Sequence, residues 1–321
     1  MAFYDVFNGD ADGICALQQL RLREPREAEL ISGLKRDIDL LSRIDAQPGD
    51  KITVLDISLD KNREALIKTL DAGASVFYAD HHFAGEIPDS QLLECHIDVA
   101  ATTCTSLIVN NCLGGAQPGW AVVGAFGDNF DQPAFELGRS LGYSYTELNE
   151  LQQLGICLNY NGYGFELDDL LFHPVDLYRC VHPYADPLEF IESEKDYKAL
   201  LAQYHDDLIR AADAIPEQQN ETAAVFLLPD QTWAKRIVGV MGNDLAKRYP
   251  DRAHALLVKM GDGRHRVSVR APYNDRQGAD DICRQFISGG GRKAAAGINA
   301  LEQAQLDNFV KCFSEYYGEA L

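Results

Sequence analysis

The segment AFYDVFNGDADG, residues 2–13, joins a short apolar run to a turn rich in aspartate and glycine. The apolar half, residues 2–7, has the length and residue types of a β-strand. Residues 14–23 follow with the apolar spacing of a helix. A strand, a loop and a helix in this order are typical of an alternating α/β domain.

The same pattern recurs further along the chain. Residues 51–57 predict a strand that ends at Asp56, and residues 62–72 predict the helix that follows it. Residues 75–79 predict another strand, directly before an Asp-His-His triplet. Continuously apolar strands are typical of a parallel sheet with helices on both faces. We therefore predict an α/β fold that begins with a parallel-sheet domain.

Length and composition are those of a globular protein of about two domains. Of the 321 residues, 46% are hydrophobic and 24% are charged. No run of about 18 uncharged apolar residues is present, so we expect no membrane-spanning helix. Residues 1–13 carry three aspartates and no basic segment, so we expect no secretory signal. Eight cysteines without a CxxC pair favour reduced thiols and a cytoplasmic location.

Charge is unevenly distributed along the chain. Residues 216–321 contain 14 basic and 13 acidic side chains, whereas residues 1–215 contain 15 basic and 36 acidic ones. The total of −20 argues against a protein that coats long nucleic acid, because such binding depends on a basic surface. The distribution favours a metal-collecting first part and an anion-contacting second part, with surface solubility as the alternative.

We predict three segments along the chain. They are a catalytic, metal-binding domain over residues 1–186, a linker helix over residues 187–216, and a smaller α/β domain over residues 217–321. The linker is predicted from an amphipathic pattern over residues 187–214, which Pro216 closes. A new alternation of strands and helices begins at residue 223 and supplies the second domain.

Aspartates gather at one edge of the predicted sheet. Asp10, Asp12, Asp56, Asp80 and Asp128 each lie at or just beyond the carboxyl end of a predicted strand, or in the turn after it. That edge binds ligands in open parallel sheets. Crowded carboxylates repel one another unless cations are shared between them, and oxygen ligands with nearby imidazoles favour a pair of Mn²⁺ or Mg²⁺ ions. Taken singly, each aspartate is also compatible with a turn or a helix cap.

A glycine-rich segment, SGGGRKAAAG, occupies residues 288–297 of the second domain. Glycines let a backbone approach a phosphate closely, and a helix N-terminus offers unpaired N–H groups. Cations beside a helix N-terminus are unfavourable unless an anion lies between them. Arg292 and Lys293 therefore favour a phosphate site over a packing turn, and Arg270 on the preceding predicted strand is a further candidate.

Together these motifs resemble the DHH family of phosphoesterases over most of the chain. Its first to fourth motifs are matched by Asp10-Ala-Asp-Gly13, by Asp56 in Val-Leu-Asp-Ile, by Asp80-His81-His82 and by Asp128. The associated DHHA1 domain of RecJ-like exonucleases and nanoRNases is matched by residues 233–249, Gly261-Asp-Gly263, Arg270 and residues 289–297.

The resemblance implies a role for each matching residue. One Mn²⁺ would be held by Asp10 and Asp56, and the second by Asp12, Asp56, His81 and Asp128, so that Asp56 bridges the two ions. His82 would contact the scissile phosphate or the leaving group, and Asp80 would orient a histidine. The substrate would bind to Arg270, Gly289, Gly290, Gly291, Arg292 and Lys293.

Two positions depart from the family pattern. The family usually has Asp or His where this chain has Asn8, so a neutral carbonyl ligand is expected to weaken the first ion site. The DHHA1 signature usually reads Gly-Gly-Gly-His, whereas this chain has Arg292, a permanently charged and bidentate phosphate partner. We therefore expect a different substrate terminus to be recognised.

We predict a Mn²⁺-dependent phosphodiesterase that hydrolyses linear dinucleotides or short oligoribonucleotides to nucleoside 5′-monophosphates, with Mg²⁺ as the alternative ion. The acidic charge favours a short substrate, because capture of a polymer depends on basic surface. Two alternatives stay open, a single-strand exonuclease of the RecJ type and a catalytically weakened nucleotide-binding module. Homodimerisation also stays open.

Overall fold

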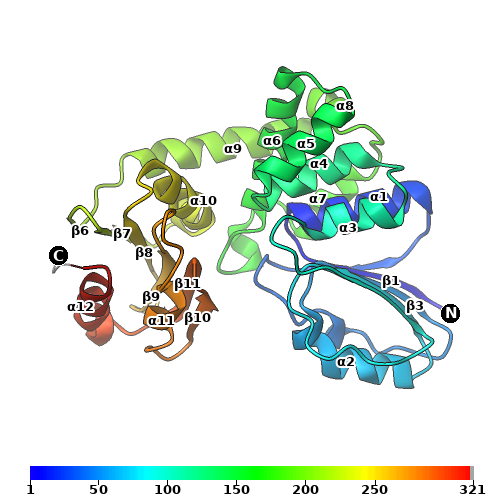
Figure 1. Ribbon diagram of the computed structural model, residues 1–321, viewed down its shortest axis with the longest axis horizontal. Helices are drawn as coiled ribbons and strands as arrows, with labels where there is room; N and C mark the ends of the chain where they lie inside the picture. The colour runs from blue at the N-terminus through cyan, green and yellow to red at the C-terminus, as the bar shows by residue number, and fades with distance from the viewer. Residues whose placement is uncertain (319–321) are drawn as a thin grey trace. The chain divides into compact units, whose positions relative to one another are not determined.

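The computed structural model describes residues 1–318 and has the α/β architecture predicted from the sequence (Figure 1). It divides into two compact units, Met1–Ala202 and Gln203–Leu321, and each unit contains a β-sheet of its own. Within residues 1–318, no helix is both long enough and apolar enough to cross a membrane.

The sheet of the first unit is entirely parallel, which confirms the prediction. Its order is β2-β1-β3-β4-β5, with bounds Phe3–Phe7 (β1), Glu29–Ile31 (β2), Lys51–Leu55 (β3), Ser75–Asp80 (β4) and Leu93–Ile97 (β5). The chain leaves β1 on one side to form β2 and then returns past β1 to form β3. The carboxyl ends of β1 and β3 are therefore a topological switch point, where open α/β sheets bind ligands.

Helices cover both faces of this sheet, with α2 on one face and α1 and α3 on the other (Figure 1). The short element η1 packs against α2. Their bounds are Ala11–Arg23 (α1), Leu41–Arg43 (η1), Leu59–Asp71 (α2) and Thr105–Cys112 (α3). Val6, Val54 and Tyr78 from three neighbouring strands form a buried cluster with Leu41 and Leu66. Apolar burial on both faces explains why the strands read as nearly continuous apolar runs.

A group of helices completes the first unit after α3. Their bounds are Pro118–Gly127 (α4), Asp131–Ser140 (α5), Tyr145–Asn161 (α6), Leu167–Asp169 (η2), Pro174–Val181 (α7) and Pro187–Ser193 (α8). The strand predicted before Asp128 is wrong, because that segment is helix α4 and Asp128 is its C-terminal cap residue. Residues 119–127 are all buried, so their continuous apolarity reflects a helix surrounded by protein. Pro118 suits the first turn, where its missing N–H has no partner to lose.

The chain passes from the first unit to the second through two helices, whereas one was predicted over residues 187–214. Helix α8 ends at Ser193, and α9 spans Lys195–Ala212. Glu194 between them has extended backbone angles, φ −79° and ψ 118°. Its side chain accepts a hydrogen bond from the N–H of Asp196 (3.0 Å), which starts the new helix.

The second unit contains a mixed sheet in the order β10-β11-β9-β8-β7-β6. The strand bounds are Gln218–Gln219 (β6), Ala223–Leu228 (β7), Ala253–Lys259 (β8), His265–Arg270 (β9), Gly289–Arg292 (β10) and Ala295–Leu301 (β11). The helix bounds are Thr232–Arg248 (α10), Ala279–Cys283 (α11), Gln303–Gln305 (η3) and Leu306–Tyr316 (α12). Val267 and Val269 of β9 join Phe309 and Phe313 of α12 in the core of this unit.

The glycine-rich segment forms a β-hairpin, so the helix N-terminus predicted there is wrong. Strand β10 pairs antiparallel with β11, and Gly291 lies opposite Ala296. Gly291 has a φ of 142°, and a Cβ at this position would lie 2.5 Å from the Cα of Ala296. Close strand pairing therefore explains this glycine.

Candidate metal centre

The turn after β1 places Asp10 at the start of helix α1. Its Oδ1 accepts hydrogen bonds from the N–H groups of Asp12 (3.1 Å) and Gly13 (3.2 Å), as an N-cap residue does. A Cβ at Gly13 would lie 2.2 Å from the carbonyl oxygen of Asn8, so this tight turn requires glycine. The cap thus uses one oxygen of Asp10 and leaves Oδ2 for another contact.

Asp12 is fully buried and faces the N-terminus of helix α3. Its two oxygens accept the backbone N–H groups of Thr105 and Ser106, each at 2.7 Å. Burial raises the pKa of Asp12, nearby His81 lowers it, and the carboxylates of Asp128 and Asp10 raise it again, so the net direction is upward. The N–H groups at the start of α3 therefore offset only part of the cost of burying this carboxylate.

Asp56 directly follows β3 and has a left-handed backbone, with a φ of 58°. Aspartate tolerates this region better than most residues, because its short polar side chain bonds locally. Its Oδ1 accepts a hydrogen bond from the Thr105 hydroxyl (3.0 Å). Burial is the largest cause that raises its pKa well above the ordinary value, and repulsion from Asp12 is the next largest.

His81 brings carboxylates from different segments together. Its Nε2 lies 3.5 Å from Oδ1 of Asp56 and 3.5 Å from Oδ2 of Asp128. Ligand atoms of Asp12, His81 and Asp128 all lie within 4.8 Å of one another, and so do those of Asp56, His81 and His82. The first turn of α1, the residues after β3 and β4, and the C-terminal cap of α4 therefore supply one cluster.

The donor atoms of this cluster fit a divalent cation. Carboxylate oxygens with an imidazole suit Mn²⁺ and related ions. Neighbouring ligands around a small octahedral ion lie about 3 Å apart, close to the 3.5 Å that separate Nε2 of His81 from each carboxylate. Burial and neighbouring carboxylates raise the pKa values of Asp12 and Asp56, and a bound cation would offset the repulsion between these carboxylates.

His82 is held by the aspartate of its own motif. Its Nδ1 lies 2.7 Å from Oδ1 of Asp80, which is fully buried. The His82 side chain is 36% exposed, whereas that of His81 is 8% exposed. The carboxylate of Asp80 therefore fixes the orientation of the more accessible of the two imidazoles.

Lys35 joins the centre, although the sequence had not indicated it. Its Nζ lies 2.5 Å from Oδ2 of Asp10, 3.0 Å from Oδ1 of Asp128 and 2.8 Å from Oδ1 of Asn159. Burial lowers the pKa of Lys35, but attraction to Asp10 and Asp128 outweighs burial and leaves the pKa well above the ordinary value. Attraction to Lys35 likewise outweighs burial at Asp10, whose pKa is lowered.

Asn8 holds the loop that carries Lys35. Its Nδ2 donates to the carbonyl oxygen of Lys35 (3.0 Å), and its Oδ1 accepts the N–H of Asp10 (3.3 Å). Asn8 is buried, with 4% exposure. Both polar ends of the side chain that was expected to be a metal ligand therefore contact the backbone.

Sequence patterns could have located Lys35 only through strand β2. Glu29–Ile31 is three residues long and half-exposed, too short for a recognisable alternation. Once β2 is placed beside β1 in a parallel sheet, the loop after it must lie at the same edge as Asp10. Thr105 and Ser106 were also missed, because no local sequence pattern shows that the N–H groups at the start of α3 contact Asp12.

The predicted substrate residues lie together on the sheet of the second unit. Arg270 of β9 pairs with Ala295 of β11, which pairs in turn with Arg292 of β10. Directly paired residues of antiparallel strands project on the same face, so this row sets two arginines about 10 Å apart on either side of a small alanine.

The adjacent row is free of bulky side chains. It consists of Ser268, Gly297 and Gly290, and a Cβ at Gly290 would meet nothing within 4 Å. Asn243 Oδ1 accepts from Nε of Arg270 (2.8 Å) and so positions its guanidinium. Gly289 lies opposite buried Ile298 and so projects on the core face, whereas Gly291 and Lys293 are exposed.

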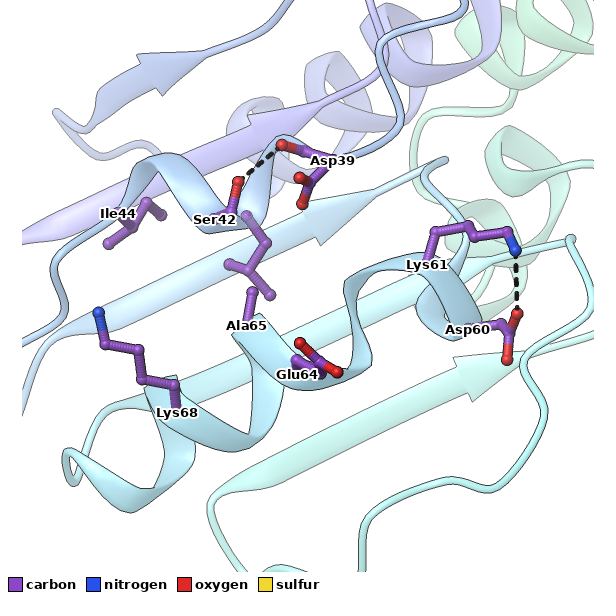
Figure 2. Close-up of a pocket in the computed structure, with 9 residues that line it drawn as sticks. Asp39, Ser42, Ile44, Asp60, Lys61, Glu64, Ala65 and Lys68 are labelled. Carbon is purple, nitrogen blue, oxygen red and sulfur yellow. Dashed lines mark hydrogen bonds and ion pairs between the residues drawn. The ribbon is translucent and has the colours of Figure 1, made fainter. Parts of the chain in front are cut away.

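A pocket of about 470 Å³ lies elsewhere in the first unit, between η1 and α2 (Figure 2). Its lining alternates in charge, with Asp60 and Glu64 beside Lys61 and Lys68 on α2. None of the predicted site residues lines it. The candidate centre is therefore defined by its converging ligand atoms, and this pocket has no part in it.

Comparisons with known proteins find one matching domain model and several solved structures of similar fold. Residues 211–319 match the family model of the DHHA1 domain. A comparison with curated proteins finds no match. Among solved structures, exonuclease RecJ bound to manganese is similar with a TM-score of 0.63 and 16% identity, over 98% of this chain and 90% of that chain.

Two further structures have the same fold. RecJ of Thermus thermophilus in complex with Mn²⁺ gives a TM-score of 0.62 at 17% identity, over 98% of this chain and 52% of that chain. The pGpG-specific phosphodiesterase PggH from Vibrio cholerae gives 0.55 at 13% identity, over 96% of both chains. The protein thus has the fold of the DHH-family phosphoesterases. Its C-terminal part is a DHHA1 domain, so the resemblance predicted from the motifs is confirmed.

Proposed function

We propose that the protein is a divalent-metal-dependent phosphodiesterase that hydrolyses linear dinucleotides or short oligoribonucleotides to nucleoside 5′-monophosphates. One observation carries the proposal: ligand atoms of Asp12, His81 and Asp128, from three separate segments, lie within 4.8 Å of one another. Asp56 extends this set through His81. Such convergence of unlike segments is expected of a metal site and is not needed for packing.

Each residue of the centre has a distinct task in this proposal. Asp12, Asp56, His81 and Asp128 hold the ion, of which Mn²⁺ is the first candidate and Mg²⁺ the second. When bound, such an ion supplies Lewis-acid stabilisation of the phosphoryl oxygens and lowers the pKa of a coordinated water. His82 contacts the scissile phosphate or the leaving oxygen, and Asp80 keeps its ring oriented.

Substrate phosphates bind to the DHHA1 domain in this proposal. Arg270 and Arg292 offer planar, bidentate donors on one face of the sheet. The glycines of the neighbouring row allow close approach of a sugar or phosphate to the strands. Lys293 adds a second exposed cation beside Arg292.

A short substrate is supported by charge and by fold. The net charge of −20 disfavours capture of a polymer from a distance. PggH, which has the same fold over 96% of both chains, is a phosphodiesterase specific for pGpG. We therefore choose pGpG as the first substrate to test.

The test uses chelator-stripped full-length protein with and without added Mn²⁺. It compares initial rates on pGpG, on other dinucleotides with and without a 5′-phosphate, and on a long single strand. We expect Mn²⁺-dependent release of mononucleotides, fastest from dinucleotides. No hydrolysis of any member of the panel would refute the proposal.

A RecJ-type exonuclease is the second candidate, because two of the structures with this fold are RecJ proteins. It predicts that the long strand is degraded faster than the dinucleotide. It also predicts that binding weakens steeply with salt, since several phosphates would be contacted at once.

A further inference from the structure

We propose that Lys35 takes the place of one of the two divalent ions of a two-ion centre, so that each chain binds a single ion. The inference rests on the metal centre of the proposed function and specifies its composition. The remaining ion is held by Asp12, Asp56, His81 and Asp128. Lys35 is a positioning residue in this arrangement, because its ammonium group holds Asp10 and Asp128.

The ammonium group of Lys35 makes the full set of contacts that it can make. Its three N–H donors have three oxygen partners, on Asp10, Asp128 and Asn159, at 2.5 to 3.0 Å. These oxygens come from the loop after β1, the end of α4 and helix α6. The lysine thus gathers ligands from three segments, as an ion would.

The backbone of Lys35 is fixed as firmly as its side chain. Its N–H donates to the carbonyl oxygen of Gly162 (3.0 Å), and its carbonyl oxygen accepts from Asn8 (3.0 Å). The side chain is only 26% exposed. The ammonium group is therefore a cation that belongs to the chain. Unlike a bound metal ion, it is present at any metal concentration in solution.

Lys35 and an ion at Asp10 exclude one another. A bound Mn²⁺ or Mg²⁺ would lie about 2.1 Å from a ligating carboxylate oxygen. Oδ2 of Asp10 already has the ammonium nitrogen at 2.5 Å, and Oδ1 caps helix α1 through two N–H groups. An ion at Asp10 would have to share Oδ2 with the ammonium group, and repulsion between the two cations opposes its binding.

Asn8 is consistent with the absence of an ion at Asp10. A carboxylate or imidazole at this position would be a metal ligand in the family pattern, whereas the amide here bonds to backbone on both sides. Neutral Asn8 and cationic Lys35 lower the negative charge at one end of the centre. The other end keeps the buried carboxylates of Asp12 and Asp56.

Counting ions on the wild-type chain tests the inference without any activity measurement. The chelator-stripped protein is dialysed against Mn²⁺, and bound metal is measured per chain. Electron paramagnetic resonance is recorded on the same samples, since two Mn²⁺ ions about 3.5–4 Å apart would be spin-coupled. We expect one Mn²⁺ per chain and an uncoupled six-line spectrum.

The variant that should accept a second ion is Lys35→Ala combined with Asn8→Asp. It removes the tethered cation and restores a carboxylate at the first position of the motif. We expect two Mn²⁺ per chain and a coupled spectrum. Lys61→Ala is the matched control, since Lys61 is an exposed lysine on α2, and should bind one ion. Circular dichroism shows whether each variant is folded.

The outcomes distinguish the role of Lys35 from the proposed function. Two ions on the wild-type chain would overturn the role of Lys35 and leave the proposed phosphodiesterase intact. No bound ion at all would refute the metal centre itself. A folded double variant that still binds one ion would show that Lys35 does not exclude the second, and would also overturn the inference.

Discussion

Lys35 and Asp128 are joined by an ion pair of 3.0 Å between Nζ and Oδ1. The second oxygen of Asp128, Oδ2, lies 3.5 Å from Nε2 of His81. One carboxylate therefore connects the ammonium group to the cluster that we propose holds the ion. Substitutions at either end are expected to be coupled, because both act on the orientation of Asp128.

Asp56→Asn should abolish hydrolysis while leaving the fold intact. The amide keeps the size of the side chain and tolerates the left-handed backbone at φ 58°, but it removes the charge that binds the ion. We expect kcat/KM to fall at least about 1,000-fold. The same change at Asp60, on α2, is the control and should leave the rate unchanged. An unaltered rate in Asp56→Asn would place the activity elsewhere.

Asp80→Asn should impair turnover without loss of the ion. Asp80 accepts the hydrogen bond from Nδ1 of His82 at 2.7 Å, and a neutral amide would remove the negative charge that strengthens this bond. We expect kcat to fall about 10–100-fold, as is typical when a partner of a site histidine is lost. The pH profile of kcat should also shift. If only thermal stability changes, Asp80 has a structural role alone.

Arg292→Ala should weaken substrate binding more than it slows the chemical step. A charge-assisted hydrogen bond to a phosphate is worth about 1.5–3 kcal/mol, so KM for a dinucleotide should rise about 10–100-fold. KM is measured for dinucleotides with and without a 5′-phosphate. If Arg292 binds the 5′-phosphate, the substitution should raise KM only for the dinucleotides that carry this group. Lys311→Ala on α12 is the control, since it removes an exposed lysine from a different element.

Removal of the metal should destabilise the first unit. Burial of Asp12 and Asp56 raises their pKa when no ion is present, and mutual repulsion adds to it. An ion at 100 times its Kd should stabilise the fold by about 2.7 kcal/mol. The ion must displace protons from these groups, so Mn²⁺ should bind more tightly as the pH rises. Thermal unfolding would measure the stabilisation, and calorimetry between pH 5.5 and 8 would measure the pH dependence of Mn²⁺ binding. An unfolding temperature that does not change when Mn²⁺ is added would contradict the prediction.

The second unit should lose stability in mild acid through His254. This residue of β8 is fully buried, and among residues 1–318 neither of its ring nitrogens has a hydrogen-bond partner. Burial, with a smaller effect of Arg252, lowers its pKa from 6.5 to about 4. The unfolded chain therefore binds the extra proton between these values, and the free energy of unfolding falls as the pH drops through that range.

The expected loss at pH 5 is about 2 kcal/mol relative to pH 7. His254→Leu should remove this part of the pH dependence, which urea unfolding at both pH values would measure. His205→Leu, at an exposed position on α9, is the control. If the free energy of unfolding of His254→Leu fell between pH 7 and pH 5 as much as that of the wild type, the acid sensitivity would come from other groups.

The sequence predicted correctly those residues of the acidic centre that follow a strand of the first sheet. β1, β3 and β4 are buried on both faces, so their apolar runs are unambiguous, and the residues after them are brought to one edge by parallel topology. Asp128 reached the same cluster from the end of a helix. The buried apolar run before it does not distinguish a strand from a helix by periodicity.

The parts that were missed depend on contacts between distant segments. Lys35 follows a three-residue strand, and its partners Asp10, Asp128 and Asn159 are separated from it by 25, 93 and 124 positions along the chain. No local pattern encodes such a meeting. The prediction of a helix start at the glycine-rich segment was wrong because glycines suit both a phosphate loop and close strand pairing.

The hydrogen bond between Asn8 and the carbonyl of Lys35 also has an evolutionary consequence. An acid at position 8 would be useful only if an ion lay beside it, and a lysine at position 35 only if none did. Either change alone would leave a misplaced charge in a buried turn. Among relatives of this fold, these two positions should therefore vary as a pair.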